Sequence, residues 1–241
     1  CDGILSFQKA YFLTGKMMNL NRLIRNIKTW RKRARRVLSM NKRNLNYIYP
    51  NNARRDFPCA DNKLFTKEIL KDTNVPVPKT LQTFSYFYEL KHMEVDLSQH
   101  DGFVIKPAKG SGGGGIVVIA EKNGERWVSI SGKPYSAEKL RKHITDIIFG
   151  VYSFGLSDQV IIEERIKQHA FMNQLSPFGL ADIRIIVHHH KLALCMARIP
   201  TRLSDGKANL HQGAVGVGID IKNGRTTHAI LKDRSVEVHP D

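Results

Sequence analysis

FVIKPAKGSGGGGIVVI, residues 103–119, carries more structural information than any other part of this sequence. It holds two apolar runs, which begin at Phe103 and Ile116, and between them five of the six positions 110–115 are glycine. Because glycine has no Cβ, such a loop can approach an anion closely and point its backbone N–H groups at it. Lys106, at the end of the first run, would add a positive charge near the same anion. The residues predicted to bind phosphate are therefore Lys106, Gly110, Ser111, Gly112, Gly113 and Gly114.

The surroundings of this loop exclude two common phosphate sites. A P-loop requires the pattern GxxxxGK[ST] followed by a helix, and a dinucleotide-binding loop also connects a strand to a helix. Here an apolar run of strand type follows the loop, and a third run, 126–131, comes after the turn Asn123-Gly124. The glycine loop is thus predicted to be the tip of a hairpin that folds over phosphates. On these residues alone, a flexible hairpin tip with an exposed Lys106 is the alternative.

The N-terminal part of the chain is predicted to be mostly helical. Apolar residues at helical spacing predict helices over 4–40 and 84–94, and Asp61 is a plausible N-cap for a helix to about Lys71. That third helix should bury its apolar side, which consists of Leu64, Phe65 and Ile69. Several asparagines and Pro50 predict a loop over 41–53, and the prolines of VPVP at 75–78 predict extended chain.

The C-terminal part is predicted to be rich in strands. Strand patterns cover 160–166, 182–188, 192–199 and 215–221, and a helix is expected over 137–149. The buried side of that helix should consist of Leu140, Ile144, Ile147 and Ile148. The mixture predicts an α+β fold with an antiparallel sheet beside the glycine loop. Three consecutive histidines, 188–190, alternate between the faces of a strand and so cannot chelate one metal ion; a turn is the better interpretation.

Composition narrows the range of partners. The chain has 38 Lys+Arg against 22 Asp+Glu, a net charge of +16, and ten of the basic residues lie in 22–43, which contains no acidic residue. This basic segment could bind nucleic acid or an anionic membrane surface, although a charge run is most often a solvated helix face. Cys1, Cys59 and Cys195 are too widely spaced for a metal motif and predict a reducing, cytoplasmic location. No apolar run approaches the ~20 residues of a membrane helix.

Five stretches in the same order resemble the ATP-grasp fold. They are ADNKLFTKEIL with VPVPKT, then FVIKPAKGSGGGGIVVI, VIIEERI, DIRIIV and RIPTRLSDGKANLHQGAVGVGID. Together they are similar to the alpha-L-glutamate ligase-like branch, which includes sugar-transfer-associated proteins and the enzymes that add glutamate to ribosomal proteins. The resemblance covers residues 41–241.

The resemblance implies two α+β subdomains that hold ATP between them. We expect a basic helical segment over 1–50, a first subdomain with the glycine loop over 51–166, and part of a second subdomain over 167–241. The implied activity is ATP-dependent joining of a carboxylate, glutamate or a similar amino acid, to an amine through an acyl phosphate, with Mg²⁺ as the accompanying ion. A module that binds an anionic macromolecule through the basic segment is one alternative, and an enzyme that releases a phosphorylated product without ligation is another.

The resemblance also implies roles for single residues. Lys63 and Lys106 match the two phosphate lysines, although spacing alone would make Lys63 a solvated lysine on the face it shares with Lys67 and Lys71. The adenine hinge matches Glu163, Glu164 and Ile166, which are expected to act mainly through their backbone groups. The candidates for catalysis are Arg184, Arg198, Asn209 and His211.

One feature of the family is not matched. Its metal-binding carboxylate and asparagine lie on strands that would follow Asp241. The second subdomain is therefore expected to be incomplete in this sequence, which thus appears truncated at its C-terminus, and the metal ligands stay unassigned.

Overall fold

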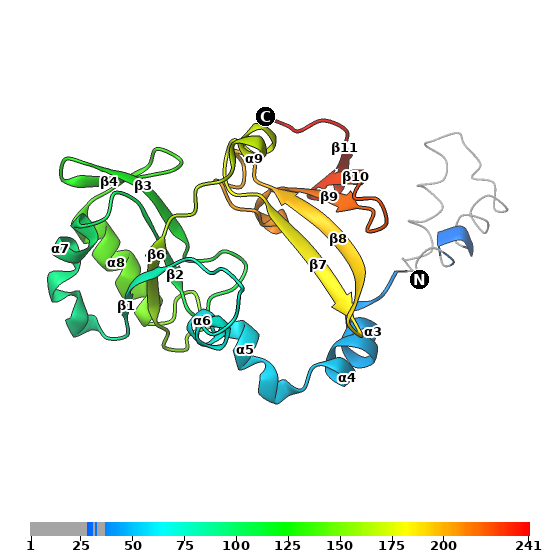
Figure 1. Cartoon of the computed structure of the whole chain (residues 1–241), viewed down its shortest axis with the longest axis horizontal. Coiled ribbons are helices and arrows are strands. Elements are labelled where there is room, and N and C mark those ends of the chain that lie inside the picture. The colour runs from blue at the N-terminus through cyan, green and yellow to red at the C-terminus, as the bar shows by residue number, and fades with distance from the viewer. Residues whose placement is uncertain (1–27, 31, 33–36) are drawn as a thin grey trace, which may run out of the picture. The chain divides into compact units, whose positions relative to one another are not determined.

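The computed structural model describes residues 28–30, 32 and 37–241 (Figure 1). The chain divides into two compact units between Arg54 and Arg55. Most of the helix expected over 4–40, and with it much of the basic segment 22–43, lies outside the described residues; residues 28–30 and 32 are helical. Among the described helices, none is long and apolar enough to cross a bilayer.

The end of the first unit is helical, so the loop predicted over 41–53 was wrong. It contains α3 (Met40–Arg43), a π-helix (Asn44–Ile48) and α4 (Tyr49–Asn51). Pro50 lies in the first turn of α4, where its missing N–H costs no helical hydrogen bond. The side chains of Asn51 and Asn52 donate to the carbonyls of Tyr47 and Ile48, both at 2.8 Å. The asparagines that suggested a loop therefore donate hydrogen bonds to carbonyl groups at the end of a helix.

Three short helices lie at the boundary between the units and at the start of the second unit. They are a 3-10 turn (Arg54–Asp56), α5 (Pro58–Asp61) and α6 (Lys63–Leu70). The N-cap of α6 is Asn62, whose side chain accepts from Leu64 N at 3.0 Å, and not Asp61. The expected buried side was also wrong, since Phe65 and Ile69 are 46% and 47% exposed.

Six antiparallel strands form the first sheet, in the order β1-β6-β2-β3-β4-β5. They are β1 (Thr80–Phe84), β2 (Phe103–Pro107), β3 (Val117–Asn123), β4 (Arg126–Ser129), β5 (Pro134–Tyr135) and β6 (Val160–Glu164). The predicted hairpin around the glycine loop is confirmed, because β2 pairs with β3 through Phe103↔Ile119 and Ile105↔Val117. The helix expected over 84–94 was misplaced: Phe84 ends β1, and the helical turns are a 3-10 helix (Phe87–His92) and α7 (Met93–Ser98).

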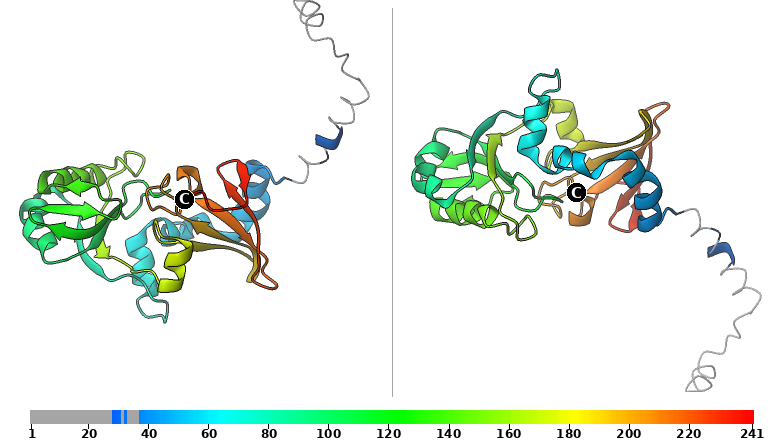
Figure 2. Two further views of the ribbon diagram at one scale, coloured as in Figure 1. Left: turned by 90° about the horizontal axis from the view of Figure 1, so that it is seen from above. Right: turned by 90° about the horizontal axis from the view of Figure 1, so that it is seen from below.

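One face of this sheet forms the core. Helix α8 (Ala137–Ile148) packs against β2, β5 and β6 and lies beside them in Figures 1 and 2. Its buried residues are those predicted: Leu140, Ile144, Ile147 and Ile148. They contact a cluster that includes Phe103, Ile105, Ile119 and Trp127, all fully buried.

Five antiparallel strands form the second sheet, in the order β11-β10-β9-β8-β7. They are β7 (Asp182–His188), β8 (Lys191–Ile199), β9 (Val215–Ile219), β10 (Thr226–Leu231) and β11 (Arg234–Val236), and α9 (Ala170–Leu175) precedes them. The predicted turn at the histidines is confirmed: His189 and His190 have φ angles of 46° and 60° between β7 and β8. The α+β class with antiparallel sheets is therefore confirmed.

Candidate functional site

A cavity of about 990 Å³ lies against the face of the first sheet that α8 does not cover. Strand β2 alternates, so that Phe103 and Ile105 enter the core while Val104 and Lys106 face the cavity. The rest of its lining comes from β3 and its approach, the residues after β4, the end of β6 and the segment after it, α9 and the residues that follow it, and the loop after β8; it includes Ile116, Val118, Ile130, Glu163, Glu164, Arg165, Ile166, Asn173, Phe178, Arg202 and Asp205. The cavity has an apolar wall formed by β2 and β3, and seven of its lining residues are charged, which suits a ligand with both an apolar and a charged part.

The segment predicted to be a hinge borders this cavity. Glu163, Glu164 and Ile166 all line it. Glu164 is exposed, and its carboxylate accepts from Lys79 N at 2.8 Å while its own N–H donates to Lys79 O at 2.9 Å. These two bonds fix the backbone where the chain leaves β6.

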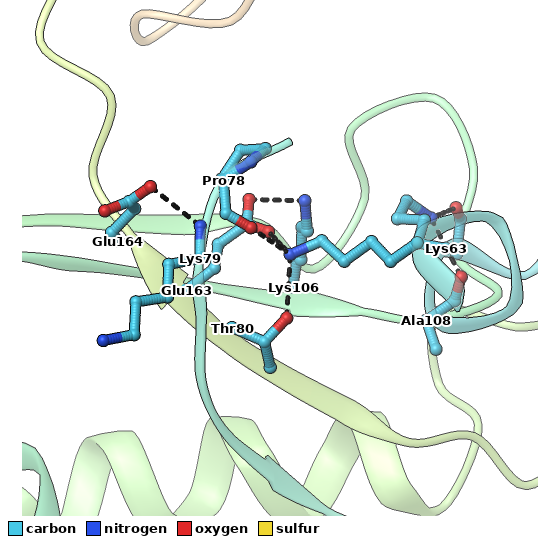
Figure 3. A network of polar contacts seen from close by, with 10 residues as sticks. Lys63, Pro78, Lys79, Thr80, Lys106, Ala108, Glu163 and Glu164 are labelled. Atoms are coloured by element: carbon cyan, nitrogen blue, oxygen red, sulfur yellow. Dashed lines mark hydrogen bonds and ion pairs between the residues drawn. The ribbon is translucent and has the colours of Figure 1, made fainter. Parts of the chain in front are cut away.

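Glu163 is buried, unlike its exposed neighbour Glu164. It is only 5% exposed, and its carboxylate is shared by two ammonium groups. Lys106 donates to Oε1 (Figure 3). Lys67 donates to Oε2 at 2.8 Å. No role was predicted for Lys67 from the sequence. The feature that could have indicated one is its position one helical turn after Lys63, on the same face of the helix.

Lys63 extends toward the glycine loop (Figure 3). Its side-chain Nζ donates to Ala108 O at 3.2 Å and to Gly110 O at 2.6 Å. Its backbone N–H also donates to Ala108 O, at 3.0 Å. Burial lowers the pKa of Lys63 from 10.5, and the nearby positive charge of Lys106 lowers it further. The carboxylates of Asp158, Glu163 and Asp61 act in the opposite direction but are outweighed, so the pKa of Lys63 is lowered.

The carbonyl groups of the glycine loop are held by side chains on both sides. Gly112 O accepts from Asn209 Nδ2 and from Gln212 Nε2, the latter at 3.0 Å. On the other side, Gly115 O lies 2.9 Å from His143 Nε2. Burial lowers the pKa of His143, which favours the neutral ring that can donate to this carbonyl.

Several backbone N–H groups of the same loop form no hydrogen bond within the described residues. Within the described residues, no acceptor is found for the N–H groups of Gly110, Ser111, Gly112 and Gly113. Gly112 and Gly113 have φ angles of 63° and 78°, a conformation that only glycine adopts without cost. The stem is fixed because Lys109 N donates to the buried carboxylate of Asp158 at 3.0 Å. A loop with its carbonyls engaged and its N–H groups available is suited to binding an anion.

The residues suggested for catalysis lie apart from the cavity. Arg198 forms a two-point ion pair with Asp182, at 2.6 Å for each contact, whereas Arg184 is exposed on β7. Asn209 contacts the glycine loop, and its carboxamide oxygen caps the turn at His211 N. The described part of the chain thus gathers Lys106 and the hinge around the cavity and Asn209 at the loop, but it does not bring Arg184, Arg198 or His211 into the cavity lining.

Comparison with known proteins gives one match. A family model described as sugar-transfer associated ATP-grasp matches residues 42–241. No curated protein and no solved structure matches.

Proposed function

The chain belongs to the sugar-transfer associated ATP-grasp family, whose domains bind ATP, and from this premise we propose that it is a carboxylate–amine ligase. The family implies ATP-dependent activity of the ligase type. The finer assignment, that glutamate or a similar amino acid is joined to an amine, is part of the proposal and draws on the sequence resemblance.

The cavity offers a place for the adenine ring. Val104, Ile116 and Val118 provide an apolar surface on one side, and we place the edge of the ring at the backbone of residues 165 and 166, which follow β6 and also line the cavity. The phosphates would meet Lys106, Lys63 and the N–H groups of residues 110–113. The single observation that supports the proposal most is that Lys106 and the hinge segment line the same cavity of about 990 Å³.

The chemistry requires positioning and charge neutralisation more than covalent help from the protein. A carboxylate oxygen of the substrate attacks the terminal phosphorus and ADP leaves, which gives an acyl phosphate. An amine nitrogen then attacks the acyl carbon, phosphate leaves, and the nitrogen loses a proton. In this proposal Arg184 and Arg198 stabilise charge on the transferred group, while Asn209 and His211 lie on the side of the acyl phosphate and amine.

Magnesium is implied by the family chemistry, but the described residues do not form a site for it. No group of three or more His, Cys, Asp and Glu side chains among them could hold a metal ion. Mg²⁺ is therefore proposed only as the ion that accompanies ATP, and no step is assigned to it.

The proposal is tested by measuring ADP release with a panel of amino-acid carboxylates and amines. We expect ATP turnover that depends on both a carboxylate and an amine, with an amide as the product. Turnover with the carboxylate alone, yielding a stable phosphorylated product, would favour the alternative without ligation. Calorimetry that detects no ATP binding would contradict the proposal at its first step.

A further inference from the structure

Lys67 and Lys106 share the Glu163 carboxylate, but the two lysines are not equivalent. The Lys67 ammonium has three acceptors: Glu163 Oε2 at 2.8 Å, Pro78 O at 2.7 Å and Thr80 Oγ1 at 2.9 Å. An ammonium has three N–H donors, so Lys67 is fully satisfied. Lys106 has Glu163 Oε1 as its acceptor among the described residues, and it lines the cavity, whereas Lys67 does not.

From this asymmetry we propose that Lys67 is a positioning residue, which keeps Glu163 paired so that Lys106 can leave it for the phosphates of ATP. The inference rests on the proposed nucleotide site. On ATP binding the ion pair between Lys106 and Glu163 breaks, while the ion pair between Lys67 and Glu163 is retained.

Burial explains why a second lysine is required. The Glu163 side chain is 6% exposed, and those of Lys67 and Lys106 are 15% and 16% exposed. A carboxylate this deeply buried is strongly unfavourable when it has no partner. If Lys106 were its one cation, moving Lys106 to a nucleotide would leave Glu163 unpaired, and that cost would oppose ATP binding. With Lys67 present, the departure of Lys106 leaves a neutral, hydrogen-bonded pair.

The sequence spacing provides this arrangement. Lys63 and Lys67 lie one helical turn apart on α6, so they extend from the same face of the helix. Lys63 reaches the stem of the glycine loop, and Lys67 reaches Glu163 on β6 and Thr80 on β1. One helix thus supplies a cation to the loop and another to the hinge.

The test is a double-mutant cycle read by calorimetric ATP affinity. Lys67→Met should weaken ATP binding by about tenfold or more, because Lys106 then stays bound to Glu163. Glu163→Gln removes the carboxylate that retains Lys106, so this variant should bind ATP more tightly than Lys67→Met does. In the Glu163→Gln background the effect of Lys67→Met should largely disappear. If Lys67 only stabilised the fold, Glu163→Gln would not reduce the effect of Lys67→Met on ATP affinity.

Lys71→Met is the matched control, since Lys71 follows the same helix and its side chain is 69% exposed. Its ATP affinity should equal that of wild type. The inference is overturned if Lys67→Met binds ATP as wild type does, or if Glu163→Gln gives no relief. If Lys67→Met fails to fold, Glu163→Gln alone decides: markedly weaker ATP binding would show that the carboxylate supports Lys106 and does not compete for it. Absence of ATP binding by wild type would instead contradict the proposed function.

Discussion

At the scale of single residues, the candidate site is defined by where each lysine finds its acceptors. Lys63 is held by carbonyl groups of the loop stem, Lys67 by three acceptors in the sheet, and Lys106 by one carboxylate at the cavity wall. Lys106 is therefore the lysine best placed to exchange its partner for a ligand.

Replacing Lys106 with alanine should weaken ATP binding roughly tenfold or more. The loss of a charge-assisted contact to phosphate typically costs about 1.5–3 kcal/mol. Calorimetry with ATP measures the change, and Lys139→Ala, at an exposed lysine in the first turn of α8, is the control. Equal ATP affinity in wild type and Lys106→Ala would contradict the assignment of Lys106 to the phosphates.

The lowered pKa of Lys63 has a consequence for stability. Because the folded state binds the proton of Lys63 less tightly than the unfolded chain does, keeping this lysine protonated in the folded state costs stability at neutral pH. The penalty fades as the pH rises through the folded pKa toward 10.5. We therefore expect any stability advantage of Lys63→Met over wild type to fall as the pH rises toward 10.5.

Urea unfolding of both proteins at a series of pH values tests this, since the other titrating groups are common to both. The prediction is contradicted if the difference in unfolding free energy is independent of pH, or if the Lys63→Met advantage grows as the pH rises.

The sequence indicates Lys63 and Lys106 as candidate phosphate-binding residues, but it does not indicate which acceptors their side chains contact. Glu163 and Lys67 are 96 residues apart, and no local pattern links them. Asn209 reaches Gly112 from 97 residues away. Such pairs depend on how the strands and helices pack, and with one sequence that packing is not visible.

At the scale of elements, the sequence predicted the structure correctly where a single periodicity of apolar residues determines it. The hairpin around the glycine loop and the buried side of α8 follow from periods of two and of 3.6 residues, and both were predicted. Prediction failed where tertiary contacts override the local pattern. Phe65 and Ile69 read as the buried side of α6, yet the lysine side faces the sheet because Glu163 and the loop carbonyls offer it acceptors.

The glycine loop should change its hydrogen exchange when ATP binds. The N–H groups of residues 110–113 have no acceptor among the described residues and should exchange quickly, whereas Gly114 N donates to Ser111 O at 3.1 Å. Phosphate oxygens would supply the missing acceptors, so ATP should protect residues 110–113 more than Gly114. Amide exchange followed by NMR with and without ATP measures this at single residues. Equal protection in both states would count against a phosphate-binding loop.

At the scale of the whole molecule, charge and nucleotide binding are separable. The basic segment 22–43 carries ten of the sixteen net positive charges. The cavity lining, the lysines of the site and the glycine loop with its contacts all lie within residues 55–241. The described residues of the basic segment (28–30, 32 and 37–43) contribute none of these contacts.

We therefore expect deletion of residues 1–43 to leave ATP affinity unchanged while it weakens binding to a polyanion. The physical reason for the second effect is that each cation that neutralises an anionic group releases a counter-ion. Losing the twelve Lys and Arg residues of 1–43 therefore reduces both the affinity and its dependence on salt. Calorimetry with ATP and heparin titrations at several salt concentrations measure the two effects on the same samples, and circular dichroism checks that the shortened protein is folded. Unchanged heparin affinity would identify the segment as a solvated helix face. Loss of ATP binding in a folded deletion variant would show that residues 1–43 contribute to the nucleotide site, against the division of the chain between Arg54 and Arg55.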